Sequence, residues 1–78
     1  MRMTIESTDH VVEILHKGAV VPARVWEGKT ERGAPVAVLV TRIAAHLDSD
    51  QAEFEQDLKE TRPPSPQAIE AFPMRLIL

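Results

Sequence analysis

The feature that most constrains the fold is a run of residues that would be apolar on both faces of a β-strand. Residues 35–44 read PVAVLVTRIA, and in a strand successive side chains point to opposite faces. A strand with one face in water alternates apolar with polar residues, whereas a strand covered on both faces reads as a continuous apolar run. One face would carry Val36, Val38 and Val40, and the other Ala37, Leu39, Thr41 and Ile43. The sequence therefore predicts a strand that must be covered on both sides.

The chain has little material with which to cover such a strand. Its 78 residues predict one domain that buries only about 60–65% of the surface of the unfolded chain. A core of that size supplies about 3–5 kcal/mol, and small folds usually add a disulfide, a metal or a second subunit. The sequence contains no cysteine, which excludes disulfides and thiolate metal sites and fits a reducing cytosol. We therefore expect a homo-oligomer.

The charge and hydropathy patterns narrow the class of partner. Nine Lys and Arg residues against twelve Asp and Glu residues give a net charge of −3, so we expect no nucleic-acid partner of the kind that a strongly basic surface attracts. The apolar runs are far too short for a membrane span. The first residues, MRMTIESTD, lack the apolar segment of a signal peptide. We expect a cytoplasmic protein without a membrane partner.

Residues 1–46 predict a four-stranded antiparallel meander. Thr8-Asp9 can turn the chain after the first strand, and Lys17-Gly18 supplies a glycine for the second turn. Pro22 cannot donate a ladder hydrogen bond, so the third strand should be at an edge or bulged near its start. Residues 30–33 fit a type I turn closed by a left-handed glycine. The predicted strands cover residues 2–7, 11–16, 19–27 and 36–45.

A single helix is predicted over residues 47–61. Two overlapping capping boxes leave its start open by about two residues. Phe54 and Leu58, four residues apart, form a narrow apolar stripe, and we expect this stripe to cover one face of the sheet. The two boxes are Asp48 with Gln51, and Asp50 with Glu53.

The chain should then continue as a proline-rich connector, residues 62–67, and an aliphatic tail, residues 68–78, which may add a strand. The prolines favour an extended conformation. The tail ends in MRLIL and could fold back over the second face of the sheet, be exchanged between copies, or leave that face to a second copy. Each large apolar side chain on that face contributes about 1.5–3 kcal/mol to stability when buried. Together these contributions are comparable with the whole stability of a small fold. The fold class is a single small α+β domain.

No residue pattern in the sequence points to catalysis, so we predict a protein that is not an enzyme and has no cofactor. The serines lie outside a GxSxG motif, and the glycines form no phosphate-binding loop. A catalytic zinc site needs three protein ligands. His16 and His46 fall at strand ends, where His10, Glu13 or Asp48 could complete a set. The HExxH spacing is missing, and we interpret the three histidines as residues at strand–turn boundaries.

Trp26 is the only tryptophan and the main candidate for a binding residue. Arg24, two residues away, shares its strand face. Tryptophan and arginine are enriched in interface hot spots, and such a pair can stack on a base or on a partner side chain. The alternative is that Trp26 caps the thin core. The predicted interaction residues are Arg24, Trp26, Val38, Val40, Leu76, Ile77 and Leu78.

The block VPARVWEGKTERGAPVAVLVTRIA, with IESTD before it and RPPSP and PMRLIL after it, resembles a group of small uncharacterised phage and prophage proteins. In that group a PARVWEG-type strand, a short turn ending in glycine, a TRIA-type strand end, a Phe/Glu-rich helix and an aliphatic tail recur in this order. The resemblance covers most of the chain and brings no catalytic residues. It implies a bacteriophage or mobile-element setting, hence the cytoplasm of a bacterial host, and a small binding or host-modulating role.

Three functions follow as hypotheses. The first is a non-enzymatic, phage-type interaction protein that self-associates and binds a host or phage protein. The second is an oligomeric nucleotide binder, in which Trp26 stacks the base and nearby cations face the phosphates. The third is a DNA-mimic inhibitor whose acidic helix occupies a basic groove. The cations of the second hypothesis are Arg24, Lys29, Arg32 and Arg42, and the acids of the third include Glu53, Glu55 and Asp57.

Overall fold

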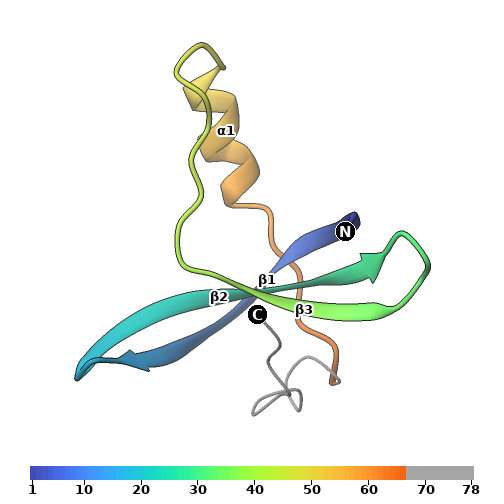
Figure 1. The fold of residues 1–78 in the computed structure, drawn as a ribbon. Helices are drawn as coiled ribbons and strands as arrows, with labels where there is room; N and C mark the ends of the chain where they lie inside the picture. Colours follow the sequence, from blue (N-terminus) through green and yellow to red (C-terminus); the bar gives the residue numbers. More distant parts are fainter. Residues whose placement is uncertain (67–78) are drawn as a thin grey trace.

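The structure is a computed structural model and describes residues 1–66 of the chain; the predicted tail, residues 68–78, lies outside them. Three strands form one antiparallel sheet in the order β1-β2-β3, and one helix, α1, follows (Figure 1). The predicted α+β class is confirmed, but the described residues form three strands and not the predicted four. The elements are β1 (Met3–His16), β2 (Ala19–Thr30), β3 (Pro35–Val40) and α1 (Gln51–Leu58).

The two N-terminal strands that the sequence predicts are a single bent strand, β1. Its ladder to β2 is interrupted between Ser7 and Val11, so that residues 8–10 lie opposite the single residue Val25. The predicted turn at Thr8-Asp9 is therefore a β-bulge, which bends a strand without ending its pairing. The chain stays in the sheet here because side chains and a distant segment bond the backbone groups that the bulge frees, as described below.

Both hairpin turns form as predicted. Lys17 and Gly18 have φ values of 50° and 80°, which is the pair of positive φ angles that a two-residue type I′ hairpin requires. At the second turn the N–H of Gly33 donates to the carbonyl oxygen of Thr30 at 2.9 Å, and the N–H of Thr30 donates to that of Ala34 at 2.9 Å. Gly33 has φ 90°. This is a type I turn followed by a left-handed glycine.

β2 is the central strand, yet Pro22 lies where it has only one neighbour. The pairing of β3 with β2 ends at Arg24↔Val40, before it reaches Pro22. The missing N–H therefore faces an open edge and costs no ladder bond, so the edge position that proline predicts is correct locally. The predicted fourth strand, residues 36–45, ends early, at Val40, and the chain leaves the sheet towards α1 (Figure 1).

α1 begins where the second of the two predicted capping boxes places it. Asp50 is the N-cap, and its carboxylate accepts a hydrogen bond from the N–H of Glu53 at 3.0 Å. The helix is shorter than predicted and stands away from the sheet, with its C-terminal end nearest to it (Figure 1). None of its residues is buried. The expectation that Phe54 and Leu58 cover a face of the sheet is wrong. Two apolar side chains on a short acidic helix offer too little apolar surface to hold the helix against the sheet.

The core of the described region is correspondingly thin. Among residues 1–66 only Ala23 and Val25 are buried hydrophobic residues, and Thr8 is the buried polar one. After α1 the chain crosses the outer edge of β1 and continues on the side of the sheet opposite the helix (Figure 1). Exposed large apolar residues include Met3, Val11, Leu15, Val20, Ile43 and Leu47.

Candidate functional site

Four of the predicted interaction residues lie together on one face of the sheet. Trp26 pairs with Val38 and Arg24 pairs with Val40, and residues paired across antiparallel strands share a face. Val36, opposite Gly28, extends the same row. We call the surface formed by Arg24, Trp26, Val36, Val38 and Val40 the Trp26 face. All five side chains are half-buried, and Leu76, Ile77 and Leu78 lie outside the described residues.

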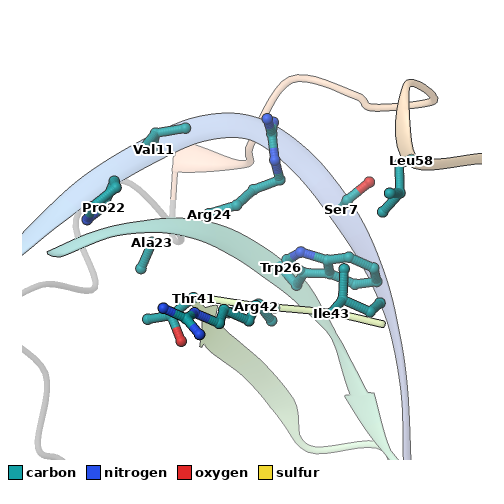
Figure 2. A pocket seen from close by; sticks show the side chains of 11 residues that line it. Ser7, Val11, Pro22, Ala23, Arg24, Trp26, Thr41, Arg42, Ile43 and Leu58 are labelled. Atoms are coloured by element: carbon teal, nitrogen blue, oxygen red, sulfur yellow. The ribbon is translucent and has the colours of Figure 1, made fainter. Parts of the chain in front are cut away.

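A hollow of about 280 Å³ opens beside the Trp26 face, between the sheet and the end of α1 (Figure 2). Trp26 and Ile43 both line it, and Leu58 reaches it from the helix. Ile43 was expected on the opposite face, with Ala37 and Leu39. It lines the same hollow as Trp26 because β3 ends at residue 40, after which the strand alternation no longer applies.

Two arginines and no carboxylate line this hollow. Nη1 of Arg24 donates to the carbonyl oxygen of Thr8 at 2.8 Å, which fixes that side chain. Arg42 is exposed, and within the described part of the chain no carboxylate forms an ion pair with either arginine. The other two cations of the nucleotide hypothesis are absent from the lining: Lys29 is on the opposite face of β2, and Arg32 is in the β2–β3 turn.

A second polar site, which the sequence did not reveal, is centred on the bulge of β1. Thr8 is fully buried, and its hydroxyl donates to the carbonyl oxygen of Val25 at 2.6 Å while accepting from the N–H of His10 at 3.3 Å. The hydroxyl thus bonds the carbonyl group of the residue that lies opposite the bulge. Sequence reasoning took Thr8 for a turn residue because threonine and aspartate side by side also favour turns.

The bulge also binds the segment that follows α1. The N–H of Asp9 donates to the carbonyl oxygen of Arg62 at 2.9 Å, and the N–H of Arg62 donates to that of Ser7 at 3.3 Å, so that Thr8 and Arg62 form a parallel bridge. The Ser7 hydroxyl donates to the carbonyl oxygen of Glu60 at 2.9 Å. The outer edge of β1 is therefore paired at the bulge by the chain itself.

Side chains reinforce this contact. Glu6 and Glu27 lie directly opposite each other on β1 and β2, an arrangement that is unfavourable for two like charges. Arg62 lies between them: its Nε is 3.0 Å from a Glu6 oxygen and its Nη1 is 2.5 Å from a Glu27 oxygen. Ser65 donates to Glu27 from its N–H at 2.9 Å and from its hydroxyl at 2.7 Å. We call these four residues the Glu27 clamp.

The clamp shifts the protonation equilibria of its members. The hydrogen bonds from Ser65 and Arg62 hold the pKa of Glu27 below its ordinary value, because they favour the charged carboxylate. The same contact with Glu27, and then that with Glu6, raises the pKa of Arg62. The side chain of Glu27 is only 12% exposed. One sequence signal could have led here: three predicted strands each carry a glutamate, and Arg62 is the arginine that follows the acidic helix.

The histidines do not converge. His10 lies in the bulge, His16 at the end of the β1–β2 hairpin and His46 in the segment before α1. Among residues 1–66 no three His, Cys, Asp or Glu side chains come together as metal ligands would. The acids Glu53 and Glu55 are exposed on α1, and the DNA-mimic hypothesis that rests on them stays a prediction.

Comparisons with known proteins provide no family for this chain. No family model matches it, and neither a curated protein nor a solved structure shows significant similarity to it. The phage resemblance therefore stays a prediction. No helix in the described part of the chain is long and apolar enough to cross a membrane.

Proposed function

We propose that this protein is a non-enzymatic interaction module that self-associates through its sheet and, in the phage setting that the resemblance implies, binds a host or phage protein. One observation carries the proposal: α1 stands away from the sheet and leaves the Trp26 face half-exposed (Figure 1). That face combines three valines with a tryptophan and an arginine, and tryptophan and arginine are enriched at the centre of interfaces.

The energetics support a partner for this surface. With only Ala23 and Val25 as buried hydrophobic residues in the described region, the core supplies little of the stability that a small fold needs. Complete burial of a valine or a comparable side chain contributes about 1.5–3 kcal/mol. Covering the Trp26 face by association would therefore add an amount comparable with the stability of the isolated domain.

Sedimentation velocity over a range of concentrations tests self-association. We expect the full chain to reach at least twice the mass of one chain, and Val38→Lys to reduce it to a monomer, since a lysine at the centre of the Trp26 face opposes burial. Val20→Lys is the matched control, because Val20 is 57% exposed and lies next to the β1–β2 turn, outside the Trp26 face. Circular dichroism verifies that both variants fold. A single-chain mass for the unmodified protein at every concentration would overturn the proposal.

The hollow beside the Trp26 face favours a second candidate, a binder of small aromatic anions such as nucleotides. Its lining combines Trp26 with Arg24 and Arg42 and contains no carboxylate. A base stacked on the indole and phosphates beside the guanidinium groups would suit it.

Thermal-shift assays with a set of nucleotides separate this candidate from the first. A ligand at a hundred times its dissociation constant adds about 2.7 kcal/mol of stability. We expect Arg42→Ala to reduce such a shift and Arg32→Ala, which removes the same charge in the β2–β3 turn, to leave it unchanged. If no nucleotide shifts the transition, the protein-binding proposal stands alone.

A further inference from the structure

We propose that the outer edge of β3 is a strand-addition site for β3 of a second copy, in an antiparallel register centred on Val38. This inference rests on the proposed self-association and adds to it a backbone contact at the sheet edge beside the Trp26 face. The two copies would then share one continuous sheet.

The hairpin geometry determines which groups of β3 face outwards. Thr30 and Ala34 close the β2–β3 hairpin with a ladder hydrogen bond, and hydrogen-bonded and non-hydrogen-bonded pairs alternate along an antiparallel ladder. Val36, Val38 and Val40 therefore bond to β2, and the intervening residues direct their backbone groups outwards. Those residues are Pro35, Ala37 and Leu39.

No described residue pairs with this edge, and its sequence does little to prevent pairing. Sheets that must keep an edge free usually protect it with charged residues, bulges or a covering segment. Pro35–Val40 contains no charged residue and pairs with β2 without a bulge. Its only protective feature is Pro35, at the first position, where it removes one outward N–H.

Pro35 selects the register. In a symmetric pair centred on Ala37, Pro35 would lie opposite the partner's Leu39 at a hydrogen-bonded pair, where proline has no N–H to donate. A pair centred on Leu39 would extend past Val40, where the strand ends. The register centred on Val38 places Ala37 opposite the partner's Leu39, so that both exchange N–H···O bonds entirely within the strands.

The same register matches side chains on both faces. On the Trp26 face Val38 meets the partner's Val38, and Val36 meets the partner's Val40, so the two valine rows join. On the other face Ala37 meets the partner's Leu39. No like charges are brought together across the symmetry axis, which favours a second copy of this chain as the occupant.

Cysteine cross-linking of the full chain tests the register directly, because the sequence contains no cysteine. At a non-hydrogen-bonded pair the Cα atoms are about 4.5 Å apart, within the range that a disulfide spans. We expect Val38→Cys to form a disulfide-linked dimer under mild oxidation. Val36→Cys is the matched control: it would face the partner's Val40, about 13 Å along the strand from the partner's equivalent cysteine.

The outcomes separate this inference from the proposed function. A self-associating protein in which Val38→Cys does not cross-link, or in which Ala37→Cys or Leu39→Cys cross-links instead, overturns the register but keeps self-association. If residues 67–78 of the same chain occupied the edge, Val38→Cys would also stay unlinked and the inference would fail. A protein that is monomeric at all concentrations overturns both proposals.

A proline substitution provides an independent measurement. Ala37→Pro removes an outward N–H without touching the ladder to β2, and we expect it to abolish the dimer seen by sedimentation. Val20→Pro is the control. The N–H of Val20 points away from β1, and β3 does not extend as far as Val20, so this substitution removes no ladder hydrogen bond. Dimerisation that survives Ala37→Pro would contradict pairing through this edge.

Discussion

Along β1 the outer edge of the sheet is interrupted by the bulge at residues 8–10 and bonded to Arg62, whereas along β3 it runs through six residues without a charge or a bulge. The first edge is held by buried and clamped polar groups, including Thr8 and Glu27. The second offers backbone donors and acceptors between apolar side chains. The chain itself therefore pairs the outer edge of β1 at the bulge, whereas the outer edge of β3 is the one at which we propose that two copies join.

The largest effect is expected from removing the hydroxyl that fills the bulge. Thr8→Val keeps the shape of the side chain but leaves the buried carbonyl of Val25 without its donor, which should cost about 2–3 kcal/mol. Urea unfolding followed by Trp26 fluorescence measures the change. Thr8→Ser keeps a hydroxyl and should lose less. Equal stability of Thr8→Val and the unmodified protein would mean that the bulge does not hold the β1 edge closed.

Hydrogen exchange at the β3 edge should give a smaller, concentration-dependent effect. In dilute protein the outward amides of Ala37 and Leu39 should exchange rapidly, whereas that of Val38, bonded to β2, stays protected. Raising the total concentration to about ten times the dissociation constant leaves roughly a fifth of the chains monomeric and should slow the outward amides about fivefold. Exchange of Ala37 and Leu39 that is independent of concentration would remove the contrast between the two edges.

The smallest effect is expected from Glu27→Gln, on the order of 1 kcal/mol near neutral pH. Because folding lowers the pKa of Glu27, its contribution is complete above the ordinary carboxyl pKa of about 4.3. It is lost as the pH falls through the lowered folded value. Urea unfolding at a series of pH values should show this acid-side loss in the unmodified protein and a weaker one in Glu27→Gln. Parallel pH profiles would show that the clamp does not stabilise the fold.

The parts of the fold that local chemistry determines could be predicted from the sequence. The glycines at both hairpin turns, the cap at Asp50 and the alternation that places Arg24 beside Trp26 on one face each depend on a few neighbouring residues. The bulge could not be predicted, because it depends on Arg62, which is distant in sequence and supplies backbone partners at Ser7 and Asp9. Without those partners, Thr8-Asp9 reads as a turn.

The position of α1 could not be predicted for a related reason. An apolar stripe shows which side of a helix prefers burial, but whether that side reaches the sheet depends on where the preceding strand ends. β3 ends at Val40, and the segment that leaves it brings Ile43 to the hollow that Trp26 and Leu58 also line (Figure 2). The hollow beside Trp26 is a consequence of that early strand end.

The parallel bridge at Arg62 determines more than local pairing. At this bridge the backbone passes the outer edge of β1, from the side of the sheet that holds α1 to the opposite side (Figure 1). A twofold axis perpendicular to a shared sheet keeps equivalent surfaces on the same side. The assembled plate would therefore place both acidic helices on one surface and both proline-rich segments, residues 62–66, on the other, giving a small protein two chemically distinct sides.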